Sequence, residues 1–236
     1  MQITLLTGKI SKIKSKFGFN LEVKTSLKAK RISLKIDAKK KLPVVTLPKF
    51  CTANYAIDFI ERHLDWIDES LNKIPEKVIF NHGDQISIMG QIYEVNHCPD
   101  ARAGVWLEDG KVNISGGAEF LNSRLKNFIK KVAKNELSKL ARQKAKDINC
   151  YVNNIVVKDT KTRWGSCSTK SNINFSWRIV LAPSIVIDYL ISHEVCHLIH
   201  HNHSKEFWAE LDNLAIDMKT GKEWLKESGN GLFSYF

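Results

Sequence analysis

The sequence predicts an α+β protein with a β-rich N-terminal part, followed by a helical part that carries a small sheet. Apolar and polar residues alternate at a period near two through much of residues 1–50, which is typical of half-buried strands. Gly116-Gly117 then interrupts the chain. Residues 118–149 are rich in Leu, Lys, Ala, Arg and Glu without Gly or Pro, which predicts one long helix. We therefore expect two domains, residues 1–117 and 118–236.

The elements of the N-terminal part follow from the change of hydrophobic period. Strands are predicted where apolar residues alternate, at Ile3/Leu5, Ile10/Ile13, 17–23 and 32–36. Within 52–74 the apolar residues are three or four apart, which predicts one amphipathic helix with Thr52 as its N-cap. Short strands separated by turn residues are then expected at 78–80, 85–89, 91–95, around Trp106 and at 112–114.

The C-terminal part predicts a few short strands and then several helices. Strands are expected at 155–157 and 173–181, and the stretch 164–168 between them has the composition of a turn or bulge. Helices are expected to begin near Pro183, Ser204 and Lys219. A chain of 236 residues can bury a core without disulfides or a structural metal, so a metal here would serve chemistry first.

The composition indicates a cytoplasmic protein. The apolar runs are far shorter than the roughly 20 residues that span a bilayer, so no membrane association is expected. Residues 1–19 alternate apolar residues with Lys and lack an uninterrupted apolar segment followed by a small-residue cleavage site, so secretion is not expected. The five scattered cysteines suit reduced thiols better than a disulfide framework.

The net charge of +11 is concentrated in the first fifth of the chain. Residues 1–50 hold 13 of the 36 lysines and arginines, against Glu22 and Asp37 alone. Such a field could attract nucleic acid, a phosphorylated substrate or an anionic surface. The alternative is that these lysines are only the solvated faces of strands.

The segment from Pro183 to His203 carries the strongest chemical signal. His193 and His197 are four residues apart on a predicted helix and therefore lie on the same side, where two imidazoles can bind one Zn²⁺. Glu194 lies beside them without being a ligand. A carboxylate in that place can take a proton from metal-bound water, whose pKa the metal lowers towards about 7. The sequence therefore predicts Glu194 as a catalytic base.

A third ligand is expected at His203. Its distance from His197 allows the helix to end near His201-Asn202, with Asn202 as a left-handed terminator, and His203 to return to the metal. Three protein ligands leave a fourth position for water, as in catalytic zinc sites. Asp217 is the alternative third ligand. Zn²⁺ is the expected metal, with Mn²⁺, Co²⁺ or Ni²⁺ also possible.

Several motifs in the second half of the chain resemble one family. They are Arg163-Trp-Gly-Ser-Cys-Ser168, Ile173-Asn-Phe-Ser-Trp-Arg178, Asp188-Tyr189, His193-Glu-Val-Cys-His197 and Asn202-His-Ser-x-x-Phe207-Trp208. The chain resembles the YgjP-like metal-dependent hydrolases, which are related to the WLM and SprT-type zincins. The resemblance implies a zincin-like catalytic core with the same ligands and base. It also implies either peptide hydrolysis or hydrolysis of uridine triphosphate to the monophosphate and pyrophosphate.

Residues that flank the stretch 164–168 and the strand predicted after it are candidates for substrate binding. Lys161, Arg163 and Arg178 could clamp a phosphate or a developing oxyanion, with structural pairing as the alternative for both arginines. Tyr189 is a further candidate. Cys167 and the tryptophans of this region are expected to be packed.

Three functions remain open from the sequence. The first is a metallopeptidase, and the second is a nucleotide pyrophosphatase that uses the same metal-bound hydroxide. The third is a nucleic-acid-binding module with structural zinc, acting through the basic N-terminal region. The expected partners are accordingly a peptide or nucleotide substrate and, under the third hypothesis, nucleic acid bound by the basic N-terminal region. The sequence leaves the oligomeric state open.

Overall fold

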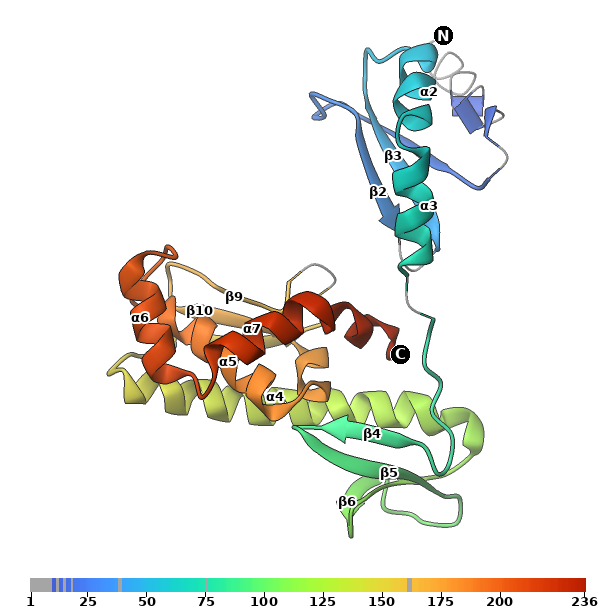
Figure 1. Ribbon diagram of the computed structural model, residues 1–236. Helices are drawn as coiled ribbons and strands as arrows, with labels where there is room; N and C mark the ends of the chain where they lie inside the picture. Colours follow the sequence, from blue (N-terminus) through green and yellow to red (C-terminus); the bar gives the residue numbers. More distant parts are fainter. Residues whose placement is uncertain are drawn as a thin grey trace. The chain divides into compact units, whose positions relative to one another are not determined.

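The chain folds into two compact units, Met1–Pro75 and Glu76–Phe236, both drawn in Figure 1. The computed structural model describes residues 10–11, 13–14, 16–17, 19–37, 40–74, 76–160 and 163–236. The division differs from the boundary expected after residue 117. The strands between residues 85 and 115 share one hydrophobic core with the long helix that follows them, so they belong to the second unit. The α+β fold class is confirmed.

The first unit is a three-stranded sheet with two helices. Strands β1 (Glu22–Ser26), β2 (Ser33–Asp37) and β3 (Leu42–Pro48) form it in the order β1-β3-β2, with β1 parallel and β2 antiparallel to the central β3. Helices α2 (Ala53–Glu61) and α3 (Leu64–Asn72) follow. Their residues Ala56, Ile60 and Ile67 are buried in one core with side chains of the strands.

Two predictions for this unit are wrong, a third is met only in part, and a fourth lies outside the described residues. The strand predicted over 17–23 begins only at Glu22, and Phe17 and Phe19 pack into the core without joining the sheet. Ile10 and Ile13 are helical, because they and Phe17 are three and four residues apart and pack on one side into the core. The helix predicted over 52–74 is broken at Arg62-His63. The strand predicted at Ile3/Leu5 falls on residues that the structure does not describe.

The central strand β3 of this unit was not predicted. Pro43 and Pro48 flank its apolar centre, and proline within a run normally argues against a strand. Both prolines lie near the ends of β3, so the ladder survives. Thr52 is the N-cap of α2 as predicted, and its side chain accepts a hydrogen bond from the Tyr55 amide.

The second unit contains two small sheets. The first consists of β4 (Gln85–Ile88), β5 (Gln91–Cys98), β6 (Val105–Glu108) and β7 (Lys111–Ser115), in the order β4-β5-β7-β6. The second consists of β8 (Asn154–Lys158), β9 (Gly165–Cys167) and β10 (Asn172–Ser176), in the order β8-β10-β9. Strand β10 is parallel to β8 and antiparallel to β9. Strand β9 occupies the stretch predicted as a turn or bulge.

Helix α4 (Leu121–Asp147) is the predicted long helix, and it joins the parts of this unit. Its buried residues recur every four positions and form one continuous stripe: Leu121, Leu125, Ile129, Ala133, Leu137, Ala141 and Ala145. This stripe belongs to the core that also contains residues of both sheets and of the C-terminal helices. In Figure 1, α4 runs along the whole unit between the first sheet and the C-terminal helices.

The C-terminal helices are α5 (Ser184–Cys196), α6 (Lys205–Leu214) and α7 (Met218–Glu227), and they begin close to the predicted positions. The strand predicted over 173–181 ends at Ser176, where a 3₁₀ helix (Trp177–Leu181) begins. A second 3₁₀ helix covers Gly229–Ser234. Instead of a strand at 78–80 there is a single bridge between Val78 and Tyr235. No helix in the described part of the chain has the length and apolar character needed to cross a bilayer.

Candidate metal centre

The histidines of the motif lie where α5 ends. His193 and Glu194 belong to the last turn of the helix, and His197 is its C-cap. The helix ends before the predicted point near His201-Asn202, and Asn202 is not left-handed as expected. The N–H groups of the three residues after His197 bond back to the carbonyls of Val195 and Cys196, so these two carbonyls are satisfied without a left-handed residue.

His203 nevertheless returns to the other two histidines. One ring nitrogen from each of His193, His197 and His203 lies within 4.8 Å of the others. The Nε2 atoms of His193 and His203 are 3.2 Å apart. Ser204 is the N-cap of α6 and accepts a hydrogen bond from the Phe207 amide, which fixes the chain directly after His203. The structure thus brings the three predicted ligands together.

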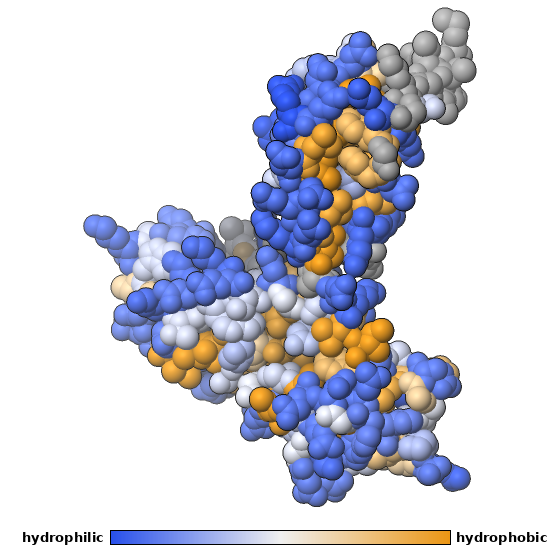
Figure 2. Space-filling view, turned by 45° about the vertical axis from the view of Figure 1, so that its right-hand side comes forward, coloured by the Kyte–Doolittle hydropathy of each residue, from blue (hydrophilic) through white to orange (hydrophobic). Residues whose placement is uncertain are grey.

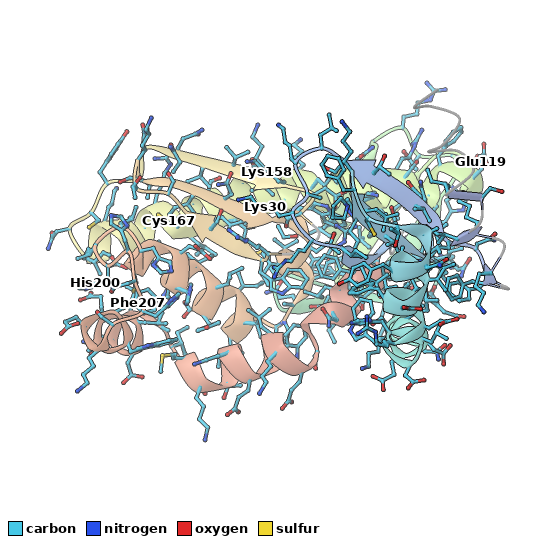
Figure 3. The ribbon with its side chains drawn as sticks, turned by 90° about the horizontal axis from the view of Figure 1, so that it is seen from above. Lys30, Glu119, Lys158, Cys167, His200 and Phe207 are labelled. Atoms are coloured by element: carbon cyan, nitrogen blue, oxygen red, sulfur yellow. The ribbon has the colours of Figure 1, made fainter. Side chains whose placement is uncertain are left out.

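The aromatic ring of Phe207 packs against all three imidazoles. Its side chain is fully buried, and its ring centroid lies 5.1, 4.7 and 4.7 Å from those of His193, His197 and His203. Figure 3 shows Phe207 with Cys167 and His200 at one end of the second unit. The buried Phe207 side chain therefore excludes water from one side of the histidine cluster.

His203, the exposed histidine of the cluster, is supported by a second aromatic ring. Trp208 stacks on His203 with centroids 5.6 Å apart and an interplanar angle of 30°. The Lys222 ammonium lies 4.3 Å from the centre of the Trp208 ring, within the range of a cation–π contact. His203 is therefore positioned by side chains from α6 and α7.

The protonation of the cluster fits metal binding. Burial, followed by the charges of its histidine neighbours, lowers the pKa of His193 to about 4, and burial also lowers the pKa of His197. Nδ1 of His197 is 2.8 Å from the carbonyl of His200, so it can donate and leave Nε2 as the metal-binding atom. Nδ1 of His193 is buried without a hydrogen-bond partner among the described residues. Three imidazoles around one point form a donor set suited to a divalent metal such as zinc.

Glu194 is held beside this cluster in a nearly dry position. The residue is only 4 % exposed, and burial raises the pKa of its carboxyl to about 8, against the opposing effect of Arg163. Gly165 of β9 lies against it: a Cβ added at this glycine would be 2.6 Å from Cγ of Glu194. A glycine is required here because any side chain would displace the carboxylate.

The cluster opens into a cleft of about 330 Å³. One wall is α5 with the histidines, and the other is the edge strand β9. The lining residues are Arg163, Gly165, Ser166, Cys167, Thr169, His193, Glu194, His197, His201 and His203. Burial, followed by the charge of Glu194, raises the pKa of the Cys167 thiol to about 11, so this side chain is not a thiolate near neutral pH.

The two candidate arginines have different places. Arg163 lines the cleft as predicted. Arg178 is buried, forms an ion pair with Asp159, and lies with its guanidinium 4.4 Å from the Trp177 ring centre. Arg178 does not line the cleft, so its position fits structural pairing and not substrate binding. Lys161 lies outside the described residues.

Tyr189 and Asp217 are also not part of the cleft. Tyr189 is 6 % exposed and packs in a small core with α6 residues, and its ring lies 5.8 Å from that of His193. It therefore packs beside His193 and does not line the cleft. Asp217 is the N-cap of α7 and accepts hydrogen bonds from Thr220.

Three residues of the site were not predicted to have a role in it. Phe207 and Gly165 were named only as parts of sequence motifs, and Lys222 carried no expectation. Their roles depend on contacts between segments far apart in sequence. The glycine within a strand-like stretch was the one available signal, since such glycines often mark a close backbone approach.

The comparison with family models agrees with this geometry. A metallopeptidase domain described as YgjP-like matches residues 30–228, so the protein is a metal-dependent hydrolase of the peptidase-like class. The chain belongs to the YgjP-like family. A search of curated proteins and a search of solved structures found no match.

Proposed function

We propose that this protein is a zinc peptidase in which His193, His197 and His203 hold the metal and Glu194 is the general base. The observation that carries the proposal is the convergence of the three imidazoles beside a buried carboxylate, in a cleft open to substrate. When bound, zinc supplies a Lewis acid that makes water a nucleophile near neutral pH and polarises the scissile bond.

The protein's own residues supply proton transfer and charge stabilisation. A pKa of about 8 for Glu194 falls as a divalent cation approaches, which brings it into the range where a carboxylate can accept a proton and return it. Glu194 would take the proton from water and pass it to the leaving amine. Arg163, at the cleft wall, would stabilise negative charge on the carbonyl oxygen.

An extended peptide is the substrate that best fits the cleft. Strand β9 is the edge of its sheet, and its three residues line the cleft opposite α5. An extended segment could add to this edge through backbone hydrogen bonds, which do not depend on side-chain identity. The scissile carbonyl would then lie between Arg163 and the histidines.

Nucleotide hydrolysis is the second candidate, and it is favoured by Arg163 in the cleft wall, which could bind a phosphate. However, Arg163 is the single lysine or arginine among the described cleft residues, because Arg178 lies outside the cleft and is paired with Asp159. A triphosphate normally requires several cations or a second metal. A purely structural zinc, the third hypothesis, fits poorly with three ligands in an open cleft.

We also place the reaction in the cytoplasm. Cys98, Cys150, Cys167 and Cys196 are free thiols, which suits a reducing compartment.

One assay separates the candidates. The zinc-loaded protein is incubated with casein and, separately, with uridine triphosphate, and Glu194→Gln serves as the blank. We expect casein cleavage that falls about 100- to 10,000-fold in Glu194→Gln while bound zinc stays unchanged. Glu223→Gln makes the same chemical change on exposed α7 and should be fully active. Base-dependent release of pyrophosphate without casein cleavage would replace the peptidase by the nucleotide enzyme.

A further inference from the structure

One end of the sheet in the first unit gathers cations and exposed apolar side chains. The parallel strands β1 and β3 end together at the pair Ser26 and Pro48, and β2 begins beside them. The segments that follow β1 and β3 therefore share this end with the segment that precedes β2. We call the following residues the basic tip: Leu27, Lys28, Lys30, Arg31, Lys49 and Phe50. Lys30, on the connection between β1 and β2, is labelled in Figure 3.

The apolar side chains of the basic tip are almost completely in water. Leu27 is 83 % exposed and Phe50 is 89 % exposed. The Lys49 ammonium lies 5.6 Å from the centre of the Phe50 ring. Figure 2 shows hydrophobic side chains reaching the surface of this unit between hydrophilic ones. The basic tip therefore presents apolar side chains and cations to solvent side by side.

The cations of the basic tip have no carboxylate partner among the residues that the structure describes. In the described part of the chain, no carboxylate forms an ion pair with Lys28, Lys30, Arg31 or Lys49. Other lysines of the same unit do have such partners, for example Lys24 and Lys40, which both bind Glu22. The positive charge at the tip is therefore available to an external anion.

The acidic residues of the unit are concentrated elsewhere, on its helices. Helices α2 and α3 contain the carboxylates Asp58, Glu61, Asp65, Asp68 and Glu69. The sequence from Leu27 to Ile36 and from Lys40 to Ile57 contains none. Simple solvation would be served by interspersed charges of both signs, whereas this separation gives the unit one positive end.

We propose that the basic tip binds single-stranded nucleic acid. Phosphates would pair with Lys28, Lys30, Arg31 and Lys49, and an unstacked base would lie on the Phe50 ring. Proteins that bind single strands combine such cations with an exposed aromatic ring, because every base offers a flat face for stacking. A membrane contact is less favourable, since inserting Phe50 would also desolvate the Lys49 ammonium above it. The proposal does not depend on the metal centre or on its reaction.

Fluorescence anisotropy with the full-length protein and a labelled 20-nucleotide oligothymidylate tests the proposal. The tip variant Lys28→Gln/Lys30→Gln/Arg31→Gln removes three positive charges. Its matched control, Lys131→Gln/Lys134→Gln/Lys139→Gln, removes the same charge from the exposed side of α4. We expect the tip variant to lose at least about tenfold in affinity and its salt dependence, the slope of log K against log salt, to fall by about 2. The α4 variant should lose no more than about twofold.

Phe50→Ala separates stacking from charge. We expect it to weaken oligothymidylate binding at least about fivefold with an unchanged salt slope, and to leave binding to a DNA duplex unaffected, because paired bases cannot stack on the ring. All of these substitutions are at exposed positions, and circular dichroism confirms folding.

Three results would overturn the proposal. Equal losses in the tip and α4 variants would show a non-specific charge effect. Binding to vesicles containing phosphatidylserine, without binding to oligothymidylate, would make the tip a membrane contact. Absence of binding to the oligonucleotide at low salt would remove the proposed ligand.

Discussion

His193 and Glu194 lie on α5 against the interior of the second unit, whereas His203 lies on the exposed segment that leads into α6. Glu194 is confined by the glycine backbone of β9, with no room for a Cβ. His203 shares the buried Phe207 ring with the other two histidines, but it is itself exposed and is stacked on Trp208. The proposed base Glu194 and the proposed ligand His193 are therefore fixed by packing in the core, whereas the proposed ligand His203 depends on contacts near the surface.

The largest expected effect is loss of the exposed ligand. We expect His203→Ala to weaken zinc binding by more than about 100-fold, since losses of outer-shell partners alone reach that size. Competition with a chromophoric chelator measures the affinity. His201→Ala removes another exposed histidine of the same cleft and should have little effect. If both variants bind zinc like the parent, the exposed segment does not supply a ligand.

The next effect should appear in turnover without loss of metal. In Gly165→Ala the new Cβ must displace the Glu194 side chain, and we expect activity to fall about 100-fold, the cost of misplacing a catalytic group by roughly 1 Å. Zinc affinity should stay within about threefold, because outer-shell changes that matter to a metal exceed this. Gly231→Ala adds the same methyl group where nothing lies within 4 Å and should be silent. Full activity of Gly165→Ala would mean that Glu194 is mobile.

A smaller effect is expected from the surface support of His203. Trp208→Leu removes the stacked ring and should weaken zinc binding about tenfold, as outer-shell losses do. Lys222→Met should cost less, because it removes only the cation above Trp208. Lys219→Met is the matched change on the same helix. Calorimetric zinc titrations of the three variants would contradict the comparison if Lys219→Met had the largest effect.

The smallest effect concerns Arg178, which belongs to the scaffold and not to the cleft. Burial opposes it, but the hydrogen bond and charge of Arg178 lower the pKa of Asp159 below its unfolded value of 3.8. The stabilisation is therefore present above pH 3.8 and is lost as the pH falls through the lower folded-state pKa. Since Asp159 is 47 % exposed, we expect Asp159→Asn to cost about 1 kcal/mol or less. Urea unfolding at neutral and acidic pH should show this difference shrinking with acidity.

The chemistry of the candidate site could largely be predicted from sequence. His193, Glu194 and His197 depend on the period of one helix, and the separation of His203 is short, so local geometry limits where it can lie. The predicted end of the helix before His203 was wrong. Helix α5 ends at Cys196, where backbone hydrogen bonds close a turn, and does not continue to Asn202. The roles of these residues as ligands and base stay predictions until the experiments above are done.

The parts that sequence could not predict depend on long-range packing. Arg163 and Arg178 occur in similar motifs, and only the position of Asp159 relative to the 3₁₀ helix separates their roles. In the first unit, the spacing of Ile10 and Ile13 does not by itself distinguish a strand from a helix. Their packing into the core of the unit favours the helix that is observed.

The fold class, the long helix α4, the family resemblance and the histidine motif could all be predicted from the amino-acid sequence, because they depend on local periodicity and short spacings. The division into two units, the arginine that faces the cleft and the close approach of β9 to Glu194 emerged only from the folded chain. It also placed the segments after β1 and β3 at one end of their sheet. Such contacts join residues distant in sequence, and strand pairing and close packing leave almost no local pattern from which they could be read.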